Sequence, residues 1–193
     1  MNLTSRIPGH RLFAVVARRD AALFDLICSH RTTWLNRLMV LATRSADAAS
    51  YLAIALVGFA VGSAGGAALL AVAITAAAAS ASGYLVKRAI ARPRPTKASP
   101  LRVALLELPD AWSFPSSHTA AAIAAALVIG AVGGPVGLAC ALAWAIAVGI
   151  SRVYVGAHYP LDVLMGGLLG AAVFAVLGDP VRDLAVLLAR AAS

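Results

Sequence analysis

The side chains that could carry chemistry fall into three short polar stretches between long apolar ones. They are Lys87 and Arg94 in the first stretch, Ser116, Ser117 and His118 in the second, and Arg152, His158 and Asp162 in the third. Cations, two imidazoles and a carboxylate suit a tetrahedral oxyanion undergoing displacement, because phosphoryl transfer requires charge stabilisation, a nucleophile and an acid for the leaving group. The stretches hold no acidic cluster for magnesium, so protein cations would replace a metal, and we expect no cofactor.

The first two stretches contain groups that favour anion binding. Arg94 precedes a proline, which stiffens the backbone around a guanidinium fork that matches phosphate oxygens. Ser116 and Ser117 follow Pro115 and resemble a helix start, where the first amides have no internal partner and attract anions. Simpler interpretations are an interfacial lysine at Lys87 and an ordinary helix cap with an interfacial histidine.

The third stretch reads SRVYVGAHYPLD, from Ser151 to Asp162. Pro160 indicates the start of a helix with Asp162 in its first turn, where a carboxylate can simply complement the helix dipole. His158 lies four residues earlier, within reach of that carboxylate. A carboxylate on one imidazole nitrogen fixes the tautomer and leaves the other nitrogen basic.

The hydropathy pattern predicts the elements that position these residues, an all-α bundle of about five transmembrane helices. The predicted spans are 48–64, 66–87, 117–132, 135–151 and 161–178, each near the length needed to cross about 30 Å of hydrocarbon. The links within 62–66 and 132–135 are short and uncharged, which indicates helical hairpins. With this connectivity, the long loop at 88–116 and all three polar stretches lie at one membrane face.

The two ends of the chain read differently from this core. Segment 1–47 predicts helices lying in the membrane interface, because charges interrupt its apolar runs. Segment 179–193 predicts an amphipathic tail of the same kind. We expect 48–178 to form the transmembrane core with the site, all within one domain.

Composition places the chain in a membrane. Of its 193 residues, 61% are hydrophobic and 12% charged, with a net charge of +8. Soluble domains are typically about half apolar and about a quarter charged. We therefore interpret the positive charge as topology-setting, lipid-contacting or substrate-binding, and not as a nucleic-acid surface.

The order and spacing of these motifs resemble the type 2 phosphatidic acid phosphatase (PAP2) superfamily, in its bacterial membrane lipid phosphate phosphatase branch. The family pattern is a lysine, six residues and Arg-Pro, then Pro-Ser-Gly-His, then Ser-Arg, five residues, His, three residues and Asp. In this sequence the motifs run from Lys87 to Pro95, from Pro115 to His118 and from Ser151 to Asp162. The same superfamily includes the vanadium haloperoxidases, but those are soluble, and five apolar helices argue against that activity.

The resemblance implies a role for each matching residue. His158 would attack phosphorus and form a phosphohistidine, Asp162 would orient it, and His118 would protonate the leaving oxygen. The phosphate would be bound by Lys87, Arg94, Ser116, Ser117 and Arg152. The chain departs from the family at Ser117, where glycine is frequent. Larger members have six spanning helices, and with five predicted spans we expect the first to have no counterpart here.

The implied activity is metal-independent dephosphorylation of a lipid phosphate or diphosphate in a bacterial plasma membrane. Polyprenyl diphosphate, phosphatidylglycerol phosphate and phosphatidate are the substrates that the resemblance suggests. A lipid phosphotransferase with the same site, or a non-enzymatic polytopic scaffold or transporter, are the alternatives. The placement of the arginines favours an active site on the cytoplasmic face, whereas the resemblance implies the outer face. The sequence leaves the oligomeric state open.

Overall fold

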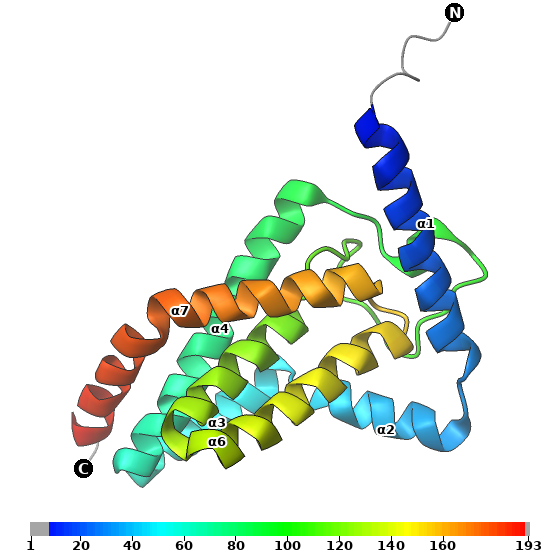
Figure 1. The fold of residues 1–193 in the computed structure, drawn as a ribbon. Coiled ribbons are helices and arrows are strands. Elements are labelled where there is room, and N and C mark those ends of the chain that lie inside the picture. Colours follow the sequence, from blue (N-terminus) through cyan, green and yellow to red (C-terminus); the bar gives the residue numbers. More distant parts are fainter. Residues whose placement is uncertain (1–7, 192–193) are drawn as a thin grey trace, which may run out of the picture.

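The protein is all-helical in this computed structural model, which describes residues 8–191 (Figure 1). Its seven helices are α1 (Pro8–Ser29), α2 (Thr33–Arg44), α3 (Ala48–Val61), α4 (Ala64–Ile90), α5 (Pro95–Ala98), α6 (Ser117–Tyr154) and α7 (Pro160–Ala191). The all-α class that hydropathy predicts is therefore confirmed.

Helix α6 is a hairpin of two arms. The backbone leaves the helical region at Gly134, with φ 65° and ψ −162°, and Pro135 then begins the second arm. A positive φ favours glycine, and proline is preorganised for a first helical turn. Figure 1 shows the chain doubling back there, and a Cβ on Gly130 would lie 2.6 Å from Leu138 of the opposite arm. The sequence prediction of a hairpin between 117–132 and 135–151 agrees with this geometry.

The number of candidate membrane spans is three or four. Helices α4, α6 and the part of α7 from Pro160 to Leu184 are long and apolar enough, and α2 with α3, bent by 50°, forms a fourth if the pair is one span. The sequence predicted five spans, and the two counts differ for two reasons. Both predicted spans within 117–151 belong to α6, and α3 has 14 residues, which is about 21 Å of helix and short of a bilayer core.

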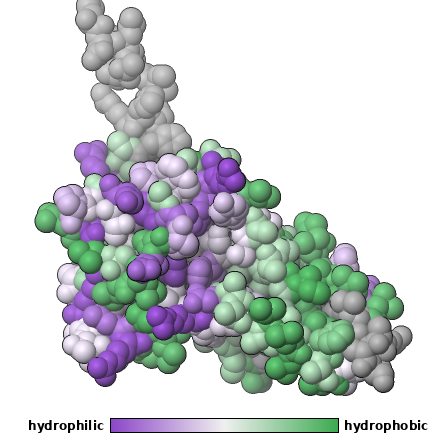
Figure 2. All heavy atoms as spheres, turned by 180° about the vertical axis from the view of Figure 1, so that it is seen from behind, coloured by the Kyte–Doolittle hydropathy of each residue, from purple (hydrophilic) through white to green (hydrophobic). Residues whose placement is uncertain are grey.

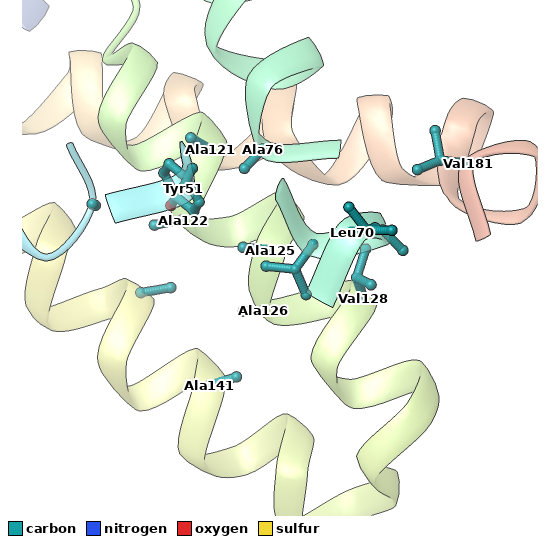
Figure 3. Packing of buried hydrophobic residues seen from close by; sticks show 14 of the residues in the cluster. Tyr51, Leu70, Ala76, Ala121, Ala122, Ala125, Ala126, Val128, Ala141 and Val181 are labelled. Atoms are coloured by element: carbon teal, nitrogen blue, oxygen red, sulfur yellow. The ribbon is translucent and has the colours of Figure 1, made fainter. Parts of the chain in front are cut away.

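The bundle packs on alanine and glycine. Its main buried cluster joins α3, α4, α6 and α7 and consists largely of alanines, with Tyr51, Leu70 and Val128 as larger members (Figure 3). Without a hydrophobic driving force between helices in lipid, small residues allow the close backbone approach that holds such a bundle. Figure 2 shows hydrophobic residues over one part of the surface and hydrophilic residues gathered on another. The chain is an integral membrane protein.

The polar segments are fixed to one end of the bundle. Arg31, between α1 and α2, donates to the Tyr154 carbonyl at 2.7 Å, and the Tyr154 hydroxyl donates to Asn36 of α2. In the loop after α4, the amides of Ser113 and Leu105 donate to the carbonyls of Arg92 and Val155. The predicted tail at 179–193 continues α7 through Pro180 to Ala191, and 192–193 lie outside the described residues.

Candidate active site

The three polar stretches meet at one end of the bundle. Lys87 comes from the last turn of α4, Arg94 precedes α5, His118 lies in the first turn of α6, Arg152 in its last turn, and Asp162 in the first turn of α7. Six of the predicted site residues are almost fully buried: Lys87, Arg94, Ser116, Arg152, His158 and Asp162. Charged groups are rarely buried without a partner or a ligand.

His158 is a neutral imidazole with one unprotonated nitrogen. Its Nδ1 lies 2.7 Å from the Ser113 carbonyl oxygen, which can only accept, so Nδ1 carries the proton. Its Nε2 lies 3.5 Å from Arg94 Nη1 and holds the lone pair. Burial first, then the nearby charges of Arg152 and Arg94, lower the pKa of His158 well below its usual value. The ring can therefore act as a nucleophile through Nε2.

Asp162 lies beside His158 without a hydrogen bond to it. Its Oδ2 is 3.8 Å from His158 Nδ1 and accepts from the Tyr159 amide at 2.8 Å. Its Oδ1 accepts from Arg92 Nη1 at 2.6 Å. The predicted orienting contact is thus replaced by the Ser113 carbonyl, and Asp162 instead bonds to a neighbouring amide and guanidinium.

Two of the predicted phosphate-binding cations share one carboxylate, Asp110. Lys87 Nζ lies 3.2 Å from Asp110 Oδ2, and Arg94 Nη2 lies 2.9 Å from Asp110 Oδ1. Partial burial raises the pKa of Asp110, but Arg94 and Lys87 outweigh it and hold that pKa below its usual value. Asp110 is therefore an ionised counter-ion between two cations.

The third cation retains an unpartnered donor. Arg152 Nη1 donates to the Thr43 hydroxyl, but its buried Nε has no hydrogen-bond partner within residues 8–191. The buried Ser117 hydroxyl also has none in that range. Unsatisfied buried donors cost free energy, and a bound oxyanion would supply their acceptors.

The start of α6 is built by its serines. The Ser116 hydroxyl caps the helix by accepting from the Thr119 amide, and the Ser116 amide donates to the Asp162 carbonyl at 2.9 Å. Ser117 packs on Gly83 of α4, where a Cβ would lie 2.8 Å from its hydroxyl oxygen. His118 Nε2 lies 2.8 Å from Asp47 Oδ1, so its partner comes from the turn before α3.

An apolar cavity of about 670 Å³ between α3 and α4 extends to His118. Its lining is mostly alanine, with Tyr51, Ser80, Tyr84 and His118 as the residues that carry polar groups. A cavity of this size and character is typical of sites that enclose an apolar ligand. It extends from His118 into the apolar part of the bundle.

Comparison with known proteins identifies the family. The sequence pattern of the PAP2 superfamily matches residues 64–178, which is more than half of the chain and includes all eight predicted site residues. The chain belongs to the PAP2 superfamily. The resemblance of the motifs is therefore confirmed at the level of the family.

Named relatives of this PAP2 protein are bacterial. Undecaprenyl-diphosphatase BcrC of Bacillus subtilis (strain 168) is 30% identical over 156 residues, covering 81% of this chain and 79% of the relative. A PAP2-type phosphatidylglycerolphosphate phosphatase from B. subtilis has a similar fold, with a TM-score of 0.69 and 24% identity, over 86% of this chain and 85% of that one. Aquifex aeolicus LpxE has a TM-score of 0.61 and 24% identity, over 80% and 92%.

Several residues around the site escaped the sequence analysis of this PAP2 chain. Asp110 and Ser113 lie in the long loop, and the only signals were that loop's length and its place just before the second motif. Asp20 of α1 accepts from Arg92 and from the Leu161 amide at 2.7 and 2.8 Å, so it braces both Arg92 and the start of α7. Asp47, the partner of His118, lies just before α3, and no motif of the sequence analysis includes it.

Proposed function

We propose that this PAP2 protein is a lipid phosphate phosphatase that works through a phosphohistidine at His158. The observation that carries the proposal is the neutral, buried His158, whose unprotonated Nε2 lies 3.5 Å from the Arg94 guanidinium. A nucleophile beside a cation is the arrangement that in-line phosphoryl transfer requires. In this proposal, Lys87, Arg94 and Arg152 supply the charge stabilisation that a metal ion supplies elsewhere.

The substrate phosphate displaces Asp110 from Lys87 and Arg94, and its oxygens accept from these cations, from Arg152 Nε and from the serines of α6. His158 Nε2 attacks phosphorus, and the bond to the leaving oxygen breaks as His118 gives that oxygen a proton. Water then attacks the phosphohistidine, its proton passes to His118, and the P–N electron pair returns to Nε2. The two steps together leave His158 and His118 as they began.

We propose lipids as the substrate class. The apolar cavity that reaches His118 would hold the tail next to the reacting phosphate. Polyprenyl diphosphate and phosphatidylglycerol phosphate are the first candidates, because relatives carry the names undecaprenyl-diphosphatase and phosphatidylglycerolphosphate phosphatase. Phosphatidate, suggested by the family motifs, is the third.

In the bilayer we propose five crossing segments, with the site at one face. They are the bent pair of α2 and α3, then helix α4, the two arms of α6, and helix α7. The reversal at Gly134 supports counting the arms of α6 separately. The first arm runs from the site to Gly134, and the second arm runs back from Pro135 to the site.

The test is phosphate release from purified protein in detergent that contains EDTA. Polyprenyl diphosphate, phosphatidylglycerol phosphate and phosphatidate are compared for the wild type, for His158→Ala and for His30→Ala, an exposed histidine with no place in the site. We expect release by the wild type and His30→Ala, and loss of at least about 10³-fold in His158→Ala. Release that persists in His158→Ala would refute the mechanism.

A further inference from the structure

We propose that Asp47 is a positioning residue for His118, so that the turn between α2 and α3 is part of the proton-donating apparatus. The observation is the 2.8 Å contact between Asp47 Oδ1 and His118 Nε2. This inference rests on the proposed function, in which His118 protonates the leaving oxygen. Asp47 lies outside the segment 64–178 that matches the PAP2 pattern.

Asp47 occupies a helix-cap position without capping the helix. It precedes α3 with an extended backbone, φ −73° and ψ 159°, yet its side chain makes no cap hydrogen bond. An aspartate at this position usually accepts from the second or third amide of its own helix, which contributes about 1 kcal/mol. Here the carboxylate is directed to His118 instead.

The turn that carries Asp47 is held against the second arm of α6. The Thr43 hydroxyl accepts from Arg152 near the end of α6. Trp144 in the second arm donates through Nε1 to the Ser45 hydroxyl at 2.9 Å. Ser50 donates to the Arg44 carbonyl at 3.0 Å, which closes the turn. Contacts on either side of Asp47 therefore fix its distance to His118.

The carboxylate determines which ring nitrogen can deliver the proton. Because a carboxylate only accepts, Nε2 of His118 carries hydrogen, and Nδ1 is the nitrogen that gives its proton to the leaving oxygen. The ring then stays bonded to Asp47 through Nε2–H as a neutral imidazole. The negative charge of Asp47 opposes the two cations near this ring, Lys87 and Arg152, and stabilises the protonated form that the step needs.

The inference predicts a dependence on the leaving group. Attack on dodecyl phosphate expels an alkoxide that needs a proton, whereas attack on the terminal phosphorus of dodecyl diphosphate expels dodecyl phosphate, a much weaker base. Initial rates of phosphate release are measured for both substrates. We expect Asp47→Asn to lower kcat about tenfold or more on dodecyl phosphate and less than about threefold on dodecyl diphosphate, with similar KM. Asparagine is also a good cap, so α3 keeps its start.

Two further variants separate positioning from folding. In a His118→Asn background, adding Asp47→Asn should cost no further activity on dodecyl phosphate, because both changes remove the same proton transfer. Asp179→Asn, which loses an exposed ion pair with Arg182 on α7, should match the wild type on both substrates.

Equal losses on both substrates, additive losses in the double variant, or no loss in Asp47→Asn would each overturn the inference while leaving the proposed function standing. A wild type that releases phosphate from neither substrate would overturn the proposed function, and this inference with it.

Discussion

At the scale of single residues, the site is a cluster of cations balanced by carboxylates around a neutral imidazole. Asp110 bridges Lys87 and Arg94. Asp162 forms an ion pair with Arg92 and makes no hydrogen bond to His158. Each carboxylate reduces the charge that repels its neighbouring cations. The same carboxylates compete with any incoming anion, so they also limit how tightly phosphate binds.

Replacing Asp110 tests this competition. In Asp110→Asn the amide can still accept from Arg94, but the negative charge between the two cations is gone. We expect the inhibition constant of inorganic phosphate to fall about tenfold, or about 1.4 kcal/mol. Asp25→Asn, which breaks a half-exposed pair with Arg102, is the control and should leave that constant unchanged. A weaker inhibition by phosphate in Asp110→Asn would show that Asp110 mainly orients the cations.

His158 makes stability depend on pH. Its pKa in the folded protein is lowered by burial and nearby cations, whereas in the unfolded chain it is about 6.5. Below about pH 6.5 the unfolded chain therefore binds a proton that the folded protein does not. The free energy of unfolding should fall as pH decreases, by up to about 1.4 kcal/mol per pH unit from this group. Thermal unfolding in detergent at pH 7.5 and 5.5 measures this pH dependence of stability. The same pH dependence in His158→Gln would contradict its assignment to His158.

At the scale of elements, close helix contacts fix the site. The Ser116 amide at the start of α6 bonds to the Asp162 carbonyl in α7, so the two helix starts are locked together. The contact depends on Gly166, where a Cβ would lie 2.5 Å from the Ser116 carbonyl oxygen. Small residues here are needed for the geometry of the site as well as for packing.

Alanine substitutions on α7 test that dependence. Gly166→Ala should force α7 away from α6 and cost about 2 kcal/mol of stability, together with activity, because the backbone of Ser116 has no room to yield. Gly167→Ala is the matched control, since its added Cβ would lie 3.8 Å from Ile123, an ordinary contact. We expect that variant to stay within about 0.5 kcal/mol of the wild type in thermal unfolding. Equal effects of the two variants would refute the argument.

Elements and motifs were the predictable part of this protein. Long apolar runs and the short, uncharged link at 132–135 indicated the bundle and the hairpin at Gly134, and the motif spacing indicated the residues from Lys87 to Asp162. The partners Asp20, Asp47 and Asp110 were not predictable in the same way. Their contacts with Arg92, His118 and Arg94 join positions far apart in the chain, so they depend on how the helices dock and leave no local pattern.

At the scale of the whole molecule, hydrophilic residues gather toward one end and hydrophobic residues cover much of the other (Figure 2). The loop after α4 and the turns at both ends of α6 lie at the polar end, whereas the turn between α3 and α4 lies at the other end of α4. A lipid phosphate would therefore have its headgroup at the membrane face and its tail in the cavity beside α3.

Single cysteines test this orientation. With Cys28 and Cys140 replaced by alanine, Lys97→Cys in the loop and Ser63→Cys in the turn before α4 should react with an impermeant maleimide from opposite sides of the membrane. The excess of arginine at the polar end predicts that end to be cytoplasmic, so only Ser63→Cys should be labelled in intact cells. Labelling of Lys97→Cys alone would place the site on the outer face, and labelling of both would contradict the proposed crossings.

The most direct test of the account is detection of the covalent intermediate on His158. The protein is mixed with a lipid phosphate, quenched in alkali, which preserves phosphohistidine, and digested for mass spectrometry. We predict phosphate on the peptide that contains His158, and none on that peptide in His158→Ala. Phosphate on a different residue, or phosphate release by the wild type with no phosphorylated peptide, would contradict the claim that His158 is the nucleophile.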